Sequence, residues 1–281
     1  MCSTGLIGTR LAMKKLLPGI DDAVYALSQA AGTDAAKAIM TTDRVPKCAT
    51  VRREPWSIGG MAKGAGMIAP ALATMIVVLT TDAVLDERRA NGALEEAVRT
   101  TFNRVDSDGC MSTNDVVLLM SSGASGVTPG PDEFEEALAE ACGKLARAIV
   151  SDAEGASHDV SVTVQGAESE EAAEAVARAV TRSNLVKTAI FGNDPNWGRI
   201  LASIGTVPVD VAEFDPMRLD VWINGVQVCH NQVEAEDRSK VDLSPREVEI
   251  VIDLNAGEAE VTLWTNDLTH DYVEENSAYS T

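Results

Sequence analysis

A threonine that opens a short apolar strand is the residue of this sequence best suited to covalent chemistry. Thr74 follows a glycine-rich stretch that carries Lys63, and it precedes the β-branched run at 75–79, which is typical of a buried strand. A self-cleaving hydrolase or acyltransferase keeps its nucleophile in such a setting. If the bond between Ala73 and Thr74 breaks, Thr74 gains an α-amine that can act as general base for its own hydroxyl. An α-amine suits this role because its ordinary pKa is about 7.7–8.0, close to working pH. From the residue alone, a β-branched side chain that merely starts a strand is the simpler interpretation.

Five short blocks stand in a fixed order and span nearly the whole chain: STGLIG at 3–8, TTD at 41–43, GMAKG at 60–64 leading to Ala73-Thr74, FGNDPNWGR at 191–199 and ENSAY at 275–279. Each block alone is a weak signal, but together they are specific. In these blocks the chain resembles the ornithine acetyltransferase family, the glutamate N-acetyltransferases of arginine biosynthesis.

The resemblance implies that the chain cleaves itself between Ala73 and Thr74. The products would be an α-chain portion, 1–73, and a β-chain, 74–281. Thr74 Oγ attacks the Ala73 carbonyl, the amide becomes an ester, and water releases the new amino terminus. In turnover the same oxygen takes the acetyl group of N2-acetylornithine and passes it to the amine of glutamate. Because both substrates share one acetyl-threonine intermediate, we expect ping-pong kinetics.

The resemblance also places the donors that stabilise the reaction's oxyanion at Thr4 and Gly5. They would offer a side-chain hydroxyl and a backbone N–H, which are suitable donors for a developing negative charge. Without the resemblance, this block is equally well a turn that contains a glycine.

Lys63 and Glu154 are expected to bind substrate. Lys63 precedes Thr74 by eleven residues in the glycine-rich loop, where its ammonium suits a substrate carboxylate; a solvated loop lysine is the alternative. Gly64 and Gly66 would let the backbone approach a ligand closely. Glu154 follows a long predicted helix and opposes the helix dipole there, which hints at a function, although a solvated helix end explains it nearly as well. By resemblance Glu154 contacts the amino groups of the substrate.

Thr41, Asn276 and Thr281 complete the expected substrate site by resemblance, together with Thr74 itself. Thr41 lies in a polar turn that also suits the end of a helix, and Thr42 is an alternative within that pair. The polar tail would ordinarily fray. The resemblance implies instead that it folds back so that Asn276 and Thr281 line the pocket.

The composition limits the partners and the compartment. The formal charge of −20 argues against nucleic acid and against an anionic membrane surface. Five cysteines without a CxxC motif, and no secretory signal, predict a reduced cytoplasmic protein. The apolar stretch at 64–81 is interrupted by Gly64, Gly66 and Pro70, so we expect a buried loop and strand there instead of a membrane span.

No cofactor or metal is expected. His158, His230 and His270 lack metal-ligand spacing, and the cysteines are expected to fill the core. The block at 194–199 is expected to be architectural. Use of acetyl-CoA as a second acetyl donor is left open. The resemblance implies that α and β chains assemble as a heterotetramer.

Alternating helical and extended patterns predict an α/β fold. The resemblance implies a layered sandwich of helices and strands, and the last third is β-rich. Asn224-Gly225 predicts a tight hairpin, and a second hairpin is expected about 255–257. The polar residues 112–115 form a cap or turn, and 121–131 form a loop; the run 116–120 is too short to assign. Helices are expected at 19–31, 34–40, 85–103, 132–152, 169–183 and 197–204, and extended segments at 49–58, 75–80, 158–164 and 185–191.

Two departures from the family pattern leave rival functions open. The chain is expected to lack a segment that precedes the STG block in the family, and Ala71-Leu72 stand where an asparagine and a methionine are common. The rivals are a self-processing amidase or aminopeptidase that uses the same threonine with water as acceptor, and an inactive truncated remnant that serves in assembly.

Overall fold

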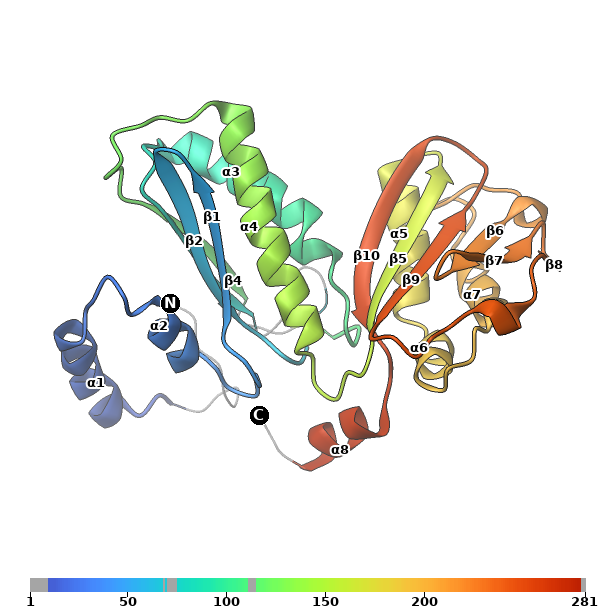
Figure 1. The fold of residues 1–281 in the computed structure, drawn as a ribbon, viewed down its shortest axis with the longest axis horizontal. Helices are drawn as coiled ribbons and strands as arrows, with labels where there is room; N and C mark the ends of the chain where they lie inside the picture. Colours follow the sequence, from blue (N-terminus) through green and yellow to red (C-terminus); the bar gives the residue numbers. More distant parts are fainter. Residues whose placement is uncertain (1–9, 68, 70–74, 111–114, 279–281) are drawn as a thin grey trace.

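Two β-sheets, each covered on one face by helices, make up the protein in the computed structural model (Figure 1). The structure describes residues 10–67, 69, 75–110 and 115–278. The α/β class and the β-rich last third are confirmed. Among the described residues, no helix has the length and apolarity needed to cross a membrane.

The first sheet has the strand order β1-β2-β3-β4. Neighbouring strands are antiparallel except β3 and β4, which run parallel because α3 crosses between them. The strand expected at 75–80 is confirmed, and the unassigned run at 116–120 is a strand. The elements of this half are β1 (Lys47–Arg53), β2 (Trp56–Lys63), β3 (Ile76–Thr81), α3 (Glu87–Thr100), η1 (Phe102–Arg104), β4 (Val116–Ser121) and α4 (Pro131–Ser151).

Helix α4 provides more of the buried core of this half than any other described element. Its apolar face packs on β1 and β2, where Phe134 meets Trp56 with ring centroids 5.7 Å apart. As expected from their spacing, Phe134, Leu138 and Leu145 are fully buried. Phe134 and Leu145 share one buried cluster with Ile58 of β2.

The glycine-rich stretch was expected to be a loop, but its first part is strand. Residues 59–63 continue β2 and pair with β3. At Gly60 an added Cβ would lie 2.8 Å from Leu79 Cδ2 and 3.0 Å from Leu145 Cδ1. This glycine therefore serves close packing between sheet and helix. The extended segment expected at 49–58 is accordingly two strands that turn at Glu54-Pro55.

The second sheet has the order β10-β5-β9-β6-β7-β8, and α5 packs on β5 and β10. The hairpin at Asn224-Gly225 is confirmed, with φ of 46° and 78° as a tight turn of this type requires. The elements are β5 (Asp159–Ala167), α5 (Glu170–Thr181), α6 (Asn184–Phe191), α7 (Trp197–Ile204), η2 (Pro216–Arg218), β6 (Asp220–Ile223), β7 (Val226–His230), β8 (Val233–Glu234), η3 (Arg238–Lys240), β9 (Glu247–Asp253) and β10 (Ala259–Asn266).

Two expectations for this half were wrong. Residues 185–191 form helix α6, because Ser183 caps the amide of Val186 and the buried residues recur at helical spacing. The segments around 255–257 do not pair as a hairpin, since β5 lies between β9 and β10. The connection passes over the end of β5, where the amides of Ala256 and Gly257 donate to Gly166 O at 2.7 and 2.8 Å.

Among the described elements, α1 (Met13–Tyr25) and α8 (His270–Ala278) lie outside these layers, whereas the short helix α2 (Gly32–Ala38) contacts β1 and β2 and buries Ala36. Helix α1 begins six residues before the helix expected at 19–31, and its apolar side chains are exposed. Helix α8 lies below the junction of the two halves, where α4 leads into β5 (Figure 1).

Candidate active site

The structure describes four of the expected site residues: Thr41, Lys63, Glu154 and Asn276. The others, Thr4, Gly5, Ala73, Thr74 and Thr281, lie outside the described residues. The structure describes the chain on both sides of the expected cleavage bond. Residues 65–67 follow β2, and Met75 precedes β3.

Asp43 joins the segment of Thr41 to the end of β2. One of its oxygens accepts the Thr41 amide at 3.0 Å, and the other accepts the Gly64 amide and Lys47 Nζ, both at 2.7 Å. Burial raises the pKa of Asp43, but the hydrogen bonds from Gly64 and Lys47 outweigh it and hold the pKa below 3.8. Asp43 is therefore a carboxylate that brings Thr41 near the strand end that carries Lys63. The TTD block marks this turn, but its sequence pattern alone does not indicate the role of Asp43.

Lys47 links this turn to the loop that carries Glu154. Its ammonium lies 2.6 Å from Asp152 Oδ2, and both side chains are buried. The same oxygen accepts the amides of Arg44 and Val45 at 2.9 and 3.3 Å. Asp152 thus fixes the start of the loop at 152–158 against the Thr41 segment.

Glu154 lies against the segment that leads toward the cleavage bond. Its amide donates to Ala65 O at 2.8 Å. A Cβ added at Gly66 would be 2.5 Å from Glu154 Oε2, so only glycine allows the carboxylate this close to the backbone. The Met67 amide donates to Asp108 Oδ2 at 2.8 Å. Lys63 is only 2% exposed, which rules out the solvated loop lysine.

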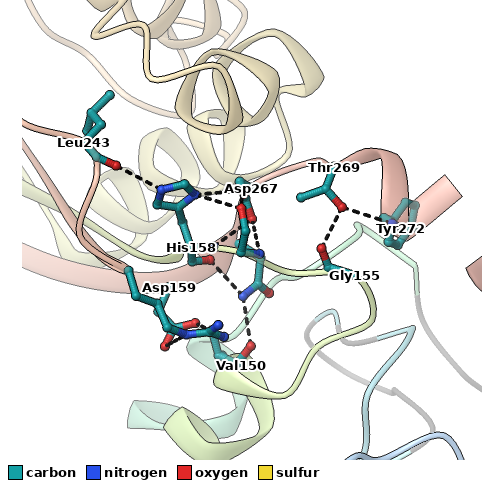
Figure 2. Close-up of polar contacts among 11 residues, drawn as sticks. Val150, Gly155, His158, Asp159, Leu243, Asp267, Thr269 and Tyr272 are labelled. Carbon is teal, nitrogen blue, oxygen red and sulfur yellow. Dashed lines mark hydrogen bonds and ion pairs between the residues drawn. The ribbon is translucent and has the colours of Figure 1, made fainter. Parts of the chain in front are cut away.

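Asp267 and His158 hold the end of the 152–158 loop to β10 (Figure 2). Asp267 accepts the amides of Ser157 and His158 at 2.9 and 3.0 Å, the Ser157 hydroxyl, and His158 Nδ1 at 2.8 Å. His158 Nε2 lies 3.0 Å from Leu243 O. Both ring nitrogens of His158 thus lie within hydrogen-bond distance of an oxygen. Burial raises the pKa of Asp267, but the bonds from His158 and Ser157 outweigh it and keep the pKa below 3.8.

Helix α8 docks on the same loop beside Glu154. Thr269 Oγ1 donates to Gly155 O at 2.6 Å and accepts the Tyr272 amide at 3.0 Å (Figure 2). Asn276 is exposed and donates to Tyr272 O within its own helix at 3.0 Å. The described part of the tail is therefore a helix held to this loop, while the contact of Asn276 with substrate stays a prediction.

Lys187 is a further candidate site residue, and no sequence pattern indicates it. It lines a small polar cavity of about 60 Å³ together with Glu154, Asp108 and Tyr272. Burial lowers the pKa of Lys187 to about 8, and its ammonium donates to Thr265 Oγ1 at 3.0 Å. Lys187 lies in helix α6, where a strand was expected.

The block at 194–199 and the cysteines were expected to have structural roles, and their contacts can be compared with that expectation. Arg199 donates to Leu185 O at 2.8 Å, consistent with the architectural role expected for its block. Cys142 and Cys229 are buried, but Cys48 and Cys110 are exposed, so the expectation that the cysteines fill the core was wrong for these two. The described part of the chain contains no group of three or more His, Cys, Asp or Glu that could hold a metal ion.

Comparison with known proteins covers the whole chain. The model of the ArgJ family matches residues 1–281. Arginine biosynthesis bifunctional protein ArgJ of Streptomyces coelicolor is 58% identical over 280 residues, which are 100% of this chain and 72% of that protein. The protein of the same name from Bifidobacterium longum is 56% identical over 99% of this chain and 72% of its own length. The crystal structure of ArgJ from Bacillus halodurans superposes with a TM-score of 0.67 at 35% identity, over 73% of this chain and 98% of that chain. This chain therefore belongs to the ArgJ family.

Proposed function

We propose that this chain is a glutamate N-acetyltransferase of arginine biosynthesis, which moves the acetyl group of N2-acetylornithine to glutamate through Thr74. The supporting observation is the convergence of three expected substrate residues on one buried network. Asp43, Lys47 and Asp152 connect the segment of Thr41, the strand end of Lys63 and the loop of Glu154.

Thr74 is released by cleavage of the bond to Ala73, which gives pieces of 73 and 208 residues (281 − 73 = 208). The length of the solved relative supports this division. The aligned 73% of this chain is about 205 residues and accounts for 98% of the solved chain. A chain of this family thus exists with nearly the length of the segment that begins at Thr74.

In turnover the α-amine of Thr74 takes the proton of its hydroxyl as Oγ attacks the acetyl carbonyl. Thr4 and Gly5 donate to the oxyanion. Lys63 binds the substrate carboxylate, and its burial strengthens this pairing because screening by water is weak there. Glu154 binds the substrate amino group. The proton passes to the departing ornithine, and the glutamate amine then takes the acetyl group.

Thr41, Asn276 and Thr281 complete the substrate site in this proposal. The steps need no cofactor, and acetyl-CoA as a second donor stays open. We further propose that the α and β chains assemble as a heterotetramer in the cytoplasm.

Intact mass and an acetyl-transfer assay test the proposal together. The purified protein should consist of the two pieces and should form N-acetylglutamate from N2-acetylornithine. Thr74→Ala should abolish both cleavage and transfer, whereas replacing Thr80, an exposed threonine of β3, by alanine should change neither. Normal processing of Thr74→Ala would refute the proposal. Amide hydrolysis without transfer would instead support the amidase, and an intact inactive chain would support the remnant.

A further inference from the structure

The small cavity beside Glu154 has polar walls that come from both halves of the molecule. It measures about 60 Å³, and its lining includes Asp108, Glu154, Lys187, Asn266 and Tyr272. One water takes up about 30 Å³ in the liquid, so the cavity has room for the end group of a substrate but not for a whole amino acid. Because Glu154 belongs both to this lining and to the expected substrate site, the cavity borders that site.

Asn266 provides this lining with a buried acceptor that lacks a donor. The residue is only 2% exposed, and its Nδ2 donates to Val150 O at 2.9 Å and to His158 O at 3.3 Å. These two carbonyls fix the orientation of the amide, since the reverse orientation would set oxygen against oxygen. Oδ1 has no hydrogen-bond partner within the part of the chain that the structure describes. An acceptor buried in this way is costly, so it indicates a donor that a ligand supplies.

Lys187 provides a buried donor on the wall of the same cavity. Only 5% of the residue is exposed, and its ammonium donates to Ser107 O and, at 3.0 Å, to Thr265 Oγ1. An ammonium carries three N–H groups, so these two bonds leave one N–H for a ligand. With its pKa at about 8, Lys187 is mostly a cation at neutral pH.

The charged and titratable groups around Lys187 come from every element packed against it. They lie in the segment after η1, the end of α5, the loop at 152–158, the segment after β10 and helix α8: Asp106, Asp108, Glu154, Arg182, Asp267 and Tyr272. Asp106 already bonds to Arg178 and Arg182. Asp267 already bonds to His158. The cavity wall thus combines several acceptors with the buried donor of Lys187.

The two substrates of the proposed reaction require such a combination. They share an α-carboxylate and an α-nitrogen, but the side chain of N2-acetylornithine ends in an ammonium and that of glutamate ends in a carboxylate. An ammonium only donates hydrogen bonds, and an ionised carboxylate only accepts them. A single subsite that takes both end groups must therefore offer acceptors to the first and a donor to the second.

We propose, on the basis of the function proposed above, that this cavity receives the side-chain end of both substrates and that Lys187 determines the specificity for glutamate. Glu154 and Asn266 Oδ1 accept from the ammonium of N2-acetylornithine. After ornithine has left, the ammonium of Lys187 donates to the side-chain carboxylate of glutamate. No covalent bond forms or breaks in the cavity.

Comparison of glutamate with glutamine as acetyl acceptor tests this role, because glutamine has nearly the same shape but no side-chain charge. Lys187→Met keeps an unbranched side chain and removes the ammonium. The value of kcat/KM for glutamate should fall about ten- to a hundredfold, as expected for a lost hydrogen bond between charged groups. The values for glutamine and for N2-acetylornithine should stay close to those of the unaltered enzyme, whereas a merely structural role of Lys187 would lower all three. Lys240→Met is the matched control, because Lys240 is an exposed lysine of the same half; it should change none of them.

The outcomes separate this inference from the proposed function. Equal losses with glutamate and glutamine, or no loss, in a Lys187→Met enzyme that still forms N-acetylglutamate overturn the inference alone. Absence of acetyl transfer in the unaltered protein overturns both.

If Lys187→Met does not fold, the unaltered enzyme decides the matter. The ratio of kcat/KM for glutamate to kcat/KM for glutamine should fall as pH rises through about 8, because a neutral Lys187 no longer attracts the carboxylate. A constant ratio from about pH 7 to about pH 9, as expected if the cavity holds only water, overturns the inference.

Discussion

Replacing Gly155 with alanine should release α8 from the loop that carries Glu154. Gly155 has a φ of +64°, and an added Cβ would lie 2.1 Å from Tyr272 N and 2.6 Å from Asp271 C. Ordinary contacts begin at 3.4 Å, so the loop or the helix must move by about 1.3 Å. The atoms in the way are backbone, which cannot rotate aside as a side chain could.

The decrease in the free energy of unfolding has two parts, backbone strain and lost hydrogen bonds. Left-handed backbone costs an alanine about 1–2 kcal/mol. Gly126 has nearly the same φ, +69°, but has open space around it, so Gly126→Ala should show the strain alone. Gly155→Ala should also lose the hydrogen bonds that join Thr269 to Gly155 and Tyr272, worth about 0.5–1.5 kcal/mol each. It should therefore be less stable than Gly126→Ala by about 1–3 kcal/mol.

Urea unfolding gives the two free energies of unfolding, and hydrogen exchange at the Tyr272 amide reports whether α8 stays docked. The substitution should also raise KM for N2-acetylornithine, because the loop of Glu154 is displaced with the helix. Equal free energies of unfolding for the two variants, together with unchanged protection of Tyr272, would refute the reasoning.

Two further substitutions address the same loop. Gly66→Ala should push the Glu154 carboxylate aside and raise KM about tenfold or more. The free energy of unfolding should change by less than about 1 kcal/mol, because the Glu154 side chain is flexible. Unaltered KM in initial-rate kinetics would count against a role for Glu154 at that position. Because the pKa of Asp267 is lowered in the fold, its contribution to stability is complete above its unfolded pKa of about 3.9 and is lost as pH falls through the lower native value. Asp267→Asn should remove this part of the acid dependence in urea unfolding at pH 7 and pH 3, and an unchanged difference between the two pH values would contradict it.

Local patterns predicted the elements that are specified within a short window of sequence. The strand at 75–80 and the helices at 85–103, 132–152 and 169–183 have clear periodicity or composition, and Asn224-Gly225 needs only its own turn geometry. The short run at 185–191 fits either a strand or a helix. Its outcome depends on the Ser183 cap and on burial against distant segments, which the run itself does not contain.

The arrangement of the site depends on contacts that no local pattern reveals. The resemblance identified Lys63 and Glu154, but the residues that hold them in place were missed. Lys47 and Asp152 are 105 positions apart, and His158 and Asp267 are 109 positions apart. Likewise, β5 separates β9 from β10 because strand order is decided by packing across the sheet.

Cleavage in front of Thr74 would divide the strands of the first sheet between two pieces, but the sheet would stay paired. Strand β2 belongs to the piece 1–73 and β3 to the piece 74–281, yet they are paired neighbours from Ile58 and Thr81 to Lys63 and Ile76. The buried core of this half draws on both pieces, so separating them would expose it to water. We therefore expect the two pieces to elute together in native gel filtration and to separate only in denaturant. Free elution of the smaller piece under native conditions would mean that the β2–β3 pairing does not hold the mature protein together.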